Sequence, residues 1–272
     1  MSYFLMSRWL RWIILIALGM TSCTVMPISY PTLTEQALTP SSPPVTPTHR
    51  QSSAPAQLTI TPETMSQGSL SPSPLSLQRL VLSAFPAPPQ VAQGELLLLY
   101  GQVTDKAGTP IAGVTVVIWQ TDANGIYDHP RAPFTEQRDK AFQFFGTAIT
   151  DEQGLYMFRT IVPGRYSPRP RHIHVKVKRE GQELLTTQFY FAMDQAEVER
   201  EGIFRAAGRN GDLLFVELIA ATDAWGRPVL LGQRDIVLDV GSGARRPTPP
   251  QAEGPYYPVA DINQHDNDLA VR

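Results

Sequence analysis

The feature that most constrains this fold is the texture of residues 94–240, where short apolar or alternating runs are separated by turn residues. Alternation with a period of two, in runs rich in Val, Ile, Thr and aromatic residues, is typical of β-strands. Asp and Gly stand together between several runs, as tight chain reversals require. We therefore predict an all-β fold, an antiparallel β-sandwich. The eight candidate strands lie within residues 95–105, 109–122, 142–151, 154–164, 172–180, 183–192, 212–224 and 235–240.

Helices are expected to be few and short. Within residues 94–240 only Asp194–Ala207 offers a plausible helix, and residues 75–85 predict a second one ahead of the sandwich. No internal repeat is present in the sequence. The net charge of −2 gives no electrostatic argument for a nucleic-acid partner.

The segment ahead of the sandwich has a different composition. Thirteen of the 25 prolines fall between Thr24 and Gln93, among many Ser, Thr and Gln residues. Such a segment buries too little apolar surface to offset the entropy that is lost on ordering. We predict a disordered linker over residues 24–93, a folded domain over residues 94–240 and a C-terminal segment over residues 241–272.

The first 23 residues have the pattern of an export signal. Arg8 and Arg11 precede a short apolar run, Ile13–Met20, which is shorter than a membrane span and suits a cleavable signal peptide. Cys23 is the only cysteine, so no disulfide can form within one chain. Residues 20–23 resemble the lipobox of bacterial lipoproteins, which implies lipidation of Cys23 and an extracytoplasmic, membrane-anchored protein of the cell envelope or periplasm. The alternative is an ordinary secretory signal, an incidental cysteine and a secreted protein.

The stretch Tyr166–Val177 contains two histidines separated by one isoleucine. In a strand, His172 and His174 point to one face while Ile173 points to the other. One interpretation is a half-exposed strand whose solvent side is polar. The other is a pair of imidazole ligands for a metal ion.

Two tyrosines extend this pair to a candidate metal site. Tyr127 follows a turn, and Tyr166 comes six positions before His172. A neutral tyrosine binds as phenolate only when a strongly charged ion lowers its pKa, which favours Fe(III) over Zn(II) or Mg(II). The alternative for each tyrosine is an amphipathic residue at a strand edge, with its hydroxyl in water. His129 shares a loop with Tyr127 and is interpreted as a surface or supporting residue, and no role is assigned to His49 in the linker.

The sandwich alone does not identify a function. Residues 100–120 and 148–166 resemble the generic prealbumin-like modules that are appended to other proteins as binding or spacer units. This resemblance implies a non-catalytic module tethered to the cell envelope.

A second and more specific resemblance covers residues 94–240. The stretches "GQVTDKAGTPIAGVTVVIWQTDANGIYDHP", "GTAITDEQGLYMFRTIVPGRY", "RPRHIHVKV" and "LLTTQFYF" resemble the successive motifs of the intradiol ring-cleavage dioxygenases, the protocatechuate 3,4-dioxygenase and catechol 1,2-dioxygenase group. In that family two tyrosines and two histidines hold a non-haem Fe(III). The resemblance implies four iron ligands, an arginine that stabilises developing negative charge, a glutamine beside the site and an active-site tryptophan. In this chain these are Tyr127, Tyr166, His172 and His174, then Arg169, Gln188 and Trp119.

The chemistry implied by the resemblance is oxidative cleavage of an aromatic ring. A catechol-type diol and O2 would be the substrates, and the ring would open between the two hydroxylated carbons to give a muconate-type diacid. Tyr166 takes the place of the tyrosine that leaves the iron when substrate binds. A degenerate member that binds catechols or ferric chelates without turnover is a further alternative, against which the intact Arg169 argues.

The sequence departs from the family in two places. The segment between Tyr166 and His172 is short, so the preferred ring substituent is not carried over from better-known members. Residues 247–269, "PTPPQAEGPYYPVADINQHDNDL", resemble the segment that normally precedes the first strand, yet they follow the last one, as in a circular permutation. The ten residues 241–250 can extend roughly 30 Å. We predict that the segment docks on its own chain or on a neighbour in a homo-oligomer, with Tyr256 or Tyr257 near the substrate. The alternative is a disordered tail.

Overall fold

The chain divides into two units, residues 1–64 and 65–272. The computed structural model describes residues 73–87 and 92–271, all within the second unit. The expected signal peptide, the lipidation site at Cys23 and most of the expected linker lie outside the described residues.

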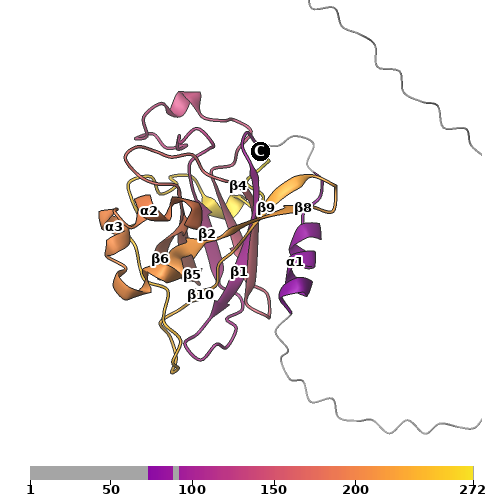
Figure 1. Cartoon of the computed structure of the whole chain (residues 1–272), viewed down its shortest axis with the longest axis vertical. Helices are drawn as coiled ribbons and strands as arrows, with labels where there is room; N and C mark the ends of the chain where they lie inside the picture. The colour runs from indigo at the N-terminus through magenta and orange to yellow at the C-terminus, as the bar shows by residue number, and fades with distance from the viewer. Residues whose placement is uncertain (1–72, 88–91, 272) are drawn as a thin grey trace, which may run out of the picture. The chain divides into compact units, whose positions relative to one another are not determined.

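The first of two five-stranded sheets is built around β1 (Leu96–Thr104). On one side β1 pairs with β4 (Leu155–Ile161) in antiparallel register. On the other side it pairs in parallel with β9 (Pro228–Gln233) and then with β10 (Ile236–Val237), and β8 (Leu218–Thr222) forms the edge beyond β9 (Figure 1). The first strand of the domain is therefore a central strand.

Gly101 of β1 lies beside the point where the chain passes from β9 to β10 along one edge of β1. A Cβ atom at this position would lie 1.8 Å from the Arg234 carbonyl oxygen, which leaves no room for any side chain. The backbone N–H of Arg234 donates to the Tyr100 carbonyl (2.8 Å), and that of Gln102 donates to Asp235 Oδ1 (3.1 Å). Glycine here lets one central strand hold two successive partners on the same edge.

The second sheet has the order β3-β2-β5-β6-β7. It contains β2 (Thr115–Trp119), β3 (Phe145–Ile149), β5 (His172–Arg179), β6 (Gln182–Phe191) and β7 (Phe215–Val216). Its first four strands are antiparallel neighbours, and β7 joins β6 in parallel. The predicted all-β sandwich is confirmed, although its strand pairs are not all antiparallel.

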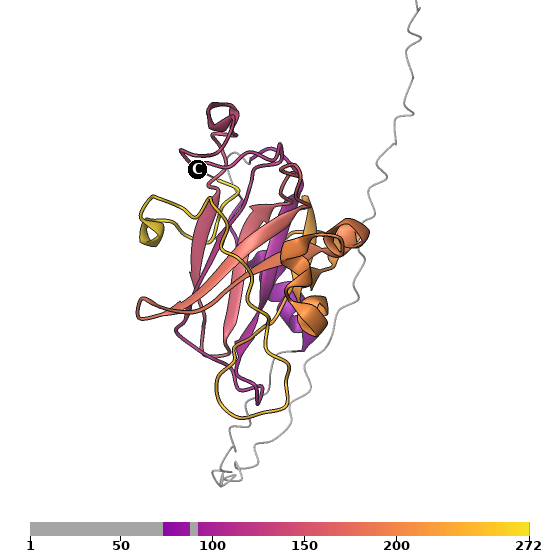
Figure 2. The ribbon, with the colours of Figure 1, turned by 90° about the vertical axis from the view of Figure 1, so that its left-hand side faces the viewer.

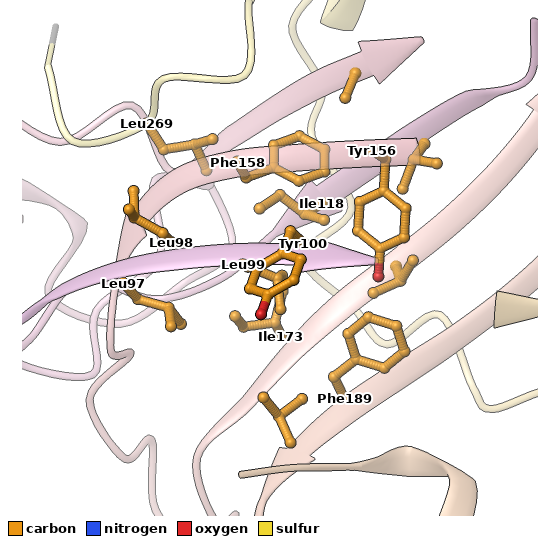
Figure 3. Close-up of a cluster of buried hydrophobic side chains, with 14 of the residues drawn as sticks. Leu97, Leu98, Leu99, Tyr100, Ile118, Tyr156, Phe158, Ile173, Phe189 and Leu269 are labelled. Carbon is orange, nitrogen blue, oxygen red and sulfur yellow. The ribbon is translucent and has the colours of Figure 1, made fainter. Parts of the chain in front are cut away.

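The core lies between the two sheets. Figure 3 shows Leu97 and Leu99 from β1 in one cluster with Ile118, Ile173 and Phe189 from β2, β5 and β6. All five of these side chains are fully buried. The inward position of Ile173 follows from the strand alternation, and it places His172 and His174 on the outer face of the second sheet.

Two of the expected elements differ from the structure. The run 212–224 forms two strands, β7 and β8, and β9 was not predicted. Pro228 opens β9, where a missing N–H costs little, yet in the sequence a proline argues against a strand. The predicted helix Asp194–Ala207 is broken into α2 (Gln195–Val198) and α3 (Gly202–Arg205), since Glu201 is extended and Gly202 follows it.

A ten-residue helix, α1 (Pro74–Ser83), packs on the sandwich through Leu77 and Val81. Ser73 caps its first turn, and Pro74 occupies the first helical position, where proline is tolerated. Short 3-10 turns occur at Thr135–Gln137, Ala192–Asp194, Gly208–Leu214 and Ile262–Gln264. Within residues 73–87 and 92–271, no helix is both long and apolar enough to cross a membrane.

Residues 247–271 form a strap that returns across the second sheet, as the yellow segment in Figure 2 shows. Thr187 Oγ1 donates to the Pro249 carbonyl (2.7 Å), and the N–H of Gln251 donates to the Thr186 carbonyl (2.9 Å). Near the far end, Asp268 pairs with the buried Arg159. The strap docks on its own chain and covers the outer face of β5.

Candidate active site

A row of three side chains crosses the outer face of the second sheet. His174 of β5 lies opposite Trp119 of β2 and opposite Gln188 of β6 in the strand register. The Trp119 and His174 rings are stacked, with centroids 4.7 Å apart and an angle of 5° between their planes. Cross-strand register thus places three of the predicted site residues side by side.

The two histidines direct the same ring atom toward a common point. His172 Nε2 lies 3.2 Å from His174 Nε2 and 3.4 Å from the Tyr127 hydroxyl oxygen. His172 Nδ1 lies 2.8 Å from the Pro170 carbonyl, which can only accept, so the proton is on Nδ1 and Nε2 carries a lone pair. Both rings are at most 3% exposed, which rules out the half-exposed strand.

The protonation of these groups is set mainly by burial. Burial and the nearby Arg169 lower the pKa of His172 to about 3. Burial, His172 and Arg169 lower the pKa of His174 well below its ordinary value. Burial also raises the pKa of the Tyr127 phenol, although Arg169 acts in the opposite direction. Without a cation, the cluster therefore consists of neutral imidazoles and a neutral phenol.

Two loops from different strand pairs bring the tyrosines together. Asp122 closes the turn before Tyr127 by accepting from the N–H groups of Asn124 (2.9 Å) and Ile126 (3.0 Å). Gly125 has a φ of +81°, and a Cβ atom there would lie 2.0 Å from the Arg165 carbonyl oxygen. This close approach joins the loop after β2 to the loop after β4. The Tyr127 and Tyr166 rings consequently meet edge to face, with centroids 5.5 Å apart.

Tyr166 is the less enclosed of the two tyrosines. It is half-buried, whereas Tyr127 is 4% exposed. Burial raises the pKa of the Tyr166 phenol, and Arg169 partly offsets this effect. Its ring lies 6.2 Å from that of His172, centroid to centroid.

Arg169 is buried beside the histidines. Its Nη1 lies 3.0 Å from His172 Nε2, and its Nη2 donates to Gln188 Oε1 (2.7 Å). On the side away from the histidines, Glu201 forms an ion pair with the guanidinium (2.5 Å). The sequence prediction did not include Glu201, because only the packing of α3 brings it to the site.

The strap provides a further wall. The Tyr256 ring lies 4.9 Å from that of Tyr127 and 5.7 Å from that of Tyr166. Tyr257 contacts Trp119 edge to face, with ring centroids 5.0 Å apart. The structure thus brings both strap tyrosines to the site, with Tyr256 beside the two candidate ligand phenols.

Gly254 and His129 complete the surroundings. Gly254 has a φ of +78° and lies directly over His174, since a Cβ atom there would be 3.1 Å from the imidazole Cε1. His129 is 3% exposed and lies beside Tyr256, with ring centroids 5.5 Å apart. Of the two positions expected for His129, the surface one is wrong, because the strap covers it, and the supporting one agrees with its place beside Tyr256.

The donor atoms fit a hard cation of high charge. In the described part of the chain, no group of three or more His, Cys, Asp or Glu side chains could hold a metal ion. A metal at His172 and His174 would therefore need the phenol oxygens of Tyr127 and Tyr166 as ligands. Because such oxygens bind as phenolates, the donor set suits Fe(III) better than a divalent ion.

One cavity borders the site and a larger one lies elsewhere. One of about 440 Å³ lies beside Arg169 and is lined by Arg165, Pro168, Pro170, Glu197, Arg200 and Glu201. A cavity of about 880 Å³ lies elsewhere, between α1, β9 and the turn at Gly208–Leu214. None of the candidate site residues lines that larger cavity.

The chain is similar to proteins of known family. A family model described as "Dioxygenase" matches residues 87–239. A catechol 1,2-dioxygenase of Acinetobacter baylyi is 34% identical over 157 residues, which cover 49% of this chain and 49% of that protein. The protocatechuate 3,4-dioxygenase beta chain of Burkholderia cepacia is 36% identical over 110 residues, which cover 37% of this chain and 46% of that protein. The chain thus spans about half the length of these relatives.

Among solved structures, the dioxygenase domain of a dioxygenase and carbohydrate-binding protein fusion from Streptomyces sp. SirexAA-E is 31% identical. The match has a TM-score of 0.40 and covers 58% of this chain and 94% of that domain.

Fold and site together define a β-sandwich of the dioxygenase class. The family model matches more than half of the chain, which establishes the family. The chain belongs to the intradiol ring-cleavage dioxygenase family, as its motifs predicted.

Proposed function

We propose that this protein is a ferric intradiol dioxygenase that cleaves the ring of a catechol-type aromatic with O2. The observation that carries the proposal is the convergence of His172 Nε2, His174 Nε2 and the Tyr127 hydroxyl, with His172 Nε2 within 3.4 Å of each of the other two, in a buried cluster beside Tyr166. Names of the relatives, which include catechol and chlorocatechol 1,2-dioxygenases, support the same substrate class.

Each side chain of the cluster has a distinct part in this proposal. Tyr127, Tyr166, His172 and His174 would hold the ion. When bound, Fe(III) would supply a Lewis-acidic centre for the two oxygens of the diol and would make the ring reactive toward O2. Tyr166, the more exposed tyrosine, would be displaced by the substrate, and its phenolate oxygen would take up a proton from a substrate hydroxyl.

Arg169 would stabilise charge on the substrate. Its guanidinium is permanently charged, buried and oriented by Gln188 and Glu201, with Nη1 directed at the cluster. A fixed positive charge in a dry site acts on negative charge as it develops on the ring. Trp119 and Tyr256 would enclose the ring from two sides, since one stacks on His174 and the other packs against Tyr127.

Colour and oxygen uptake test the proposal. Purified protein loaded with Fe(III) should be reddish, because phenolate bound to ferric iron absorbs visible light. Oxygen uptake should then be measured with catechol, protocatechuate, hydroxyquinol and substituted catechols. At least one of them should be consumed together with O2 and yield a ring-opened diacid. Protein that stays colourless after iron loading would contradict the ferric site. Coloured protein without turnover would indicate a catechol-binding protein.

We also propose that the protein is anchored outside the cytoplasm by a lipid on Cys23. The support is the sequence pattern of residues 1–23 and the Pro-rich stretch behind it. Cells grown with radiolabelled palmitate should label the native protein but not a Cys23→Ser variant, and equal labelling of both would contradict this location.

A further inference from the structure

Glu201 is a largely buried acid next to the site, and the four-ligand scheme gives it no role. Its Oε1 accepts from Arg169 Nε (2.5 Å) and its Oε2 accepts from Arg169 Nη2 (3.1 Å). The Glu201 side chain is 13% exposed and the Arg169 side chain 10%, so the pair is largely removed from water. A two-point contact of this kind fixes the plane of the guanidinium as well as its position.

The contacts of Arg169 show what this fixing achieves. Nη2 also donates to Gln188 Oε1 (2.7 Å) and to the Tyr190 hydroxyl (3.3 Å). Nε and Nη2 are thus held on the side away from the histidines. Nη1 is left directed at His172 Nε2, 3.0 Å away. The carboxylate of Glu201 therefore determines which edge of the guanidinium faces the cluster.

The fold holds Glu201 in place through a second, smaller apolar cluster. Val198 of α2 and Phe204 of α3 pack with Tyr190 and Leu214 in that cluster, and the Tyr190 and Phe204 rings meet at 5.4 Å. Glu201 lies between these two anchors, with its N–H donating to the Val198 carbonyl (2.9 Å). The break between α2 and α3 points its side chain at Arg169, at the edge of the 440 Å³ cavity.

Charge gives Glu201 a second effect. A buried guanidinium that has lost its partner is an uncompensated positive charge. At 3.0 Å from His172 Nε2, such a charge would directly oppose a cation at the same nitrogen. With Glu201 in place, the pair is neutral overall, while Nη1 still presents a local positive edge to the substrate.

We propose that Glu201 is a positioning residue that orients Arg169 and supplies the counter-charge that allows a trivalent cation to bind beside it. This inference rests on the proposed ferric function. It predicts that Glu201 acts on metal affinity through Arg169, although Glu201 is not itself a ligand.

The test compares ferric affinity, measured by competition with a ferric chelator, in four forms of the full chain. Glu201→Gln keeps the shape of the side chain, and we expect it to weaken Fe(III) binding roughly tenfold or more. Adding Arg169→Gln to that variant removes the unpaired charge and should restore Fe(III) affinity, although turnover stays lost. Glu197→Gln is the matched control, because Glu197 forms its ion pair with the half-exposed Arg165 and should bind Fe(III) like the unsubstituted protein.

If Glu201 only stabilised the fold, a second substitution at Arg169 would not restore Fe(III) affinity. Unchanged Fe(III) affinity in Glu201→Gln, or equally weak affinity in the double variant, would overturn the inference while the unsubstituted protein still binds iron and turns over substrate. Failure of the unsubstituted protein to bind Fe(III) would overturn the proposed function, and this inference with it.

Discussion

At the scale of single residues, Arg169 shows how geometry adds to charge. Its guanidinium contacts His172, Gln188, Tyr190 and Glu201 at once. A planar fork of five N–H donors can do this, and an ammonium group cannot. The residue therefore contributes an oriented positive edge, which charge alone does not provide.

Arg169→Lys should separate these two properties. The variant keeps the charge and loses the fork, so we expect kcat for ring cleavage to fall about 100-fold while the visible ferric band remains. Steady-state oxygen uptake and the absorption spectrum measure the two effects. Arg171→Lys serves as control, because Arg171 pairs with Asp194 instead. Near-normal kcat in Arg169→Lys would show that charge alone suffices.

Gly254 tests how closely the strap approaches the metal site. Gly254→Ala should destabilise the protein twice, through its φ of +78° and through contact with His174. Gly181→Ala is a matched control, since Gly181 has a φ of +82° and a Cβ atom there would have nothing within 4 Å. We expect urea unfolding to show a loss of about 1–2 kcal/mol for Gly181→Ala and a clearly larger loss for Gly254→Ala. Equal losses would mean that the strap yields freely over His174.

At the scale of elements, β5 carries the largest share of the site, and its role follows from the sequence. The alternation of residues 172–178 correctly predicts Ile173, Val175 and Val177 in the core and the histidines on the opposite face. Alternation did not predict that the histidine face is also buried, because that burial depends on the strap that covers it. Alternation indicates a face and does not reveal what covers it.

Other parts of the site and of the fold could not be predicted from local sequence patterns. Glu201 enters the site through the packing of Phe204 and Val198 on Tyr190, which are tertiary contacts. β9 was missed because a proline such as Pro228 usually breaks a strand, although here it opens one. Strand alternation singled out the histidines, and the family motifs assigned them and the two tyrosines as ligands. The spacing of Tyr127 from His172 alone would not have predicted a hydroxyl 3.4 Å from a ring nitrogen.

The strap is fastened to β5 by a buried lysine. Lys176 is 5% exposed, lies on the same face as His174 and pairs with Glu253 of the strap and with Glu183 (3.0 Å). Burial by itself lowers the pKa of Lys176, but the two carboxylates raise it above its ordinary value, so the lysine stays charged. Its Nζ also lies 4.3 Å from the centre of the Tyr257 ring. One side chain thus holds two neighbouring parts of the strap.

Lys176→Met should loosen the strap and leave the metal ligands in place. We expect unfolding free energy to fall by about 1–2 kcal/mol, a value reduced because both carboxylates are partly exposed. Backbone amides of residues 251–257 should exchange with deuterium faster, and KM for the aromatic substrate should rise as Tyr256 moves. Lys106→Met, which breaks an exposed pair with Asp239, is the control. Unchanged exchange in the strap would show that other contacts hold it.

At the scale of the whole molecule, the strap completes the fold as well as the site. Leu269 and Ala270 are fully buried, the Ala92 N–H donates to the Ala270 carbonyl (2.9 Å), and Asp268 pairs with the buried Arg159 of β4. The strap therefore contacts both sheets, one through β5 and β6 and the other through β4. A segment that lines the site is in this way also part of the core.

Metal binding should consequently stabilise the entire described domain. The candidate ligands come from the loop after β2, the loop after β4 and β5, and an ion that binds them only in the folded state shifts the unfolding equilibrium. At a free Fe(III) concentration about 100 times Kd, we expect a rise in Tm of about 5–10 °C by calorimetry. His174→Ala should lose most of this rise. His265 packs on Phe145 and is not a candidate ligand, so His265→Gln should keep the rise whatever its own starting Tm. An equal rise in His174→Ala would place the iron elsewhere in the protein.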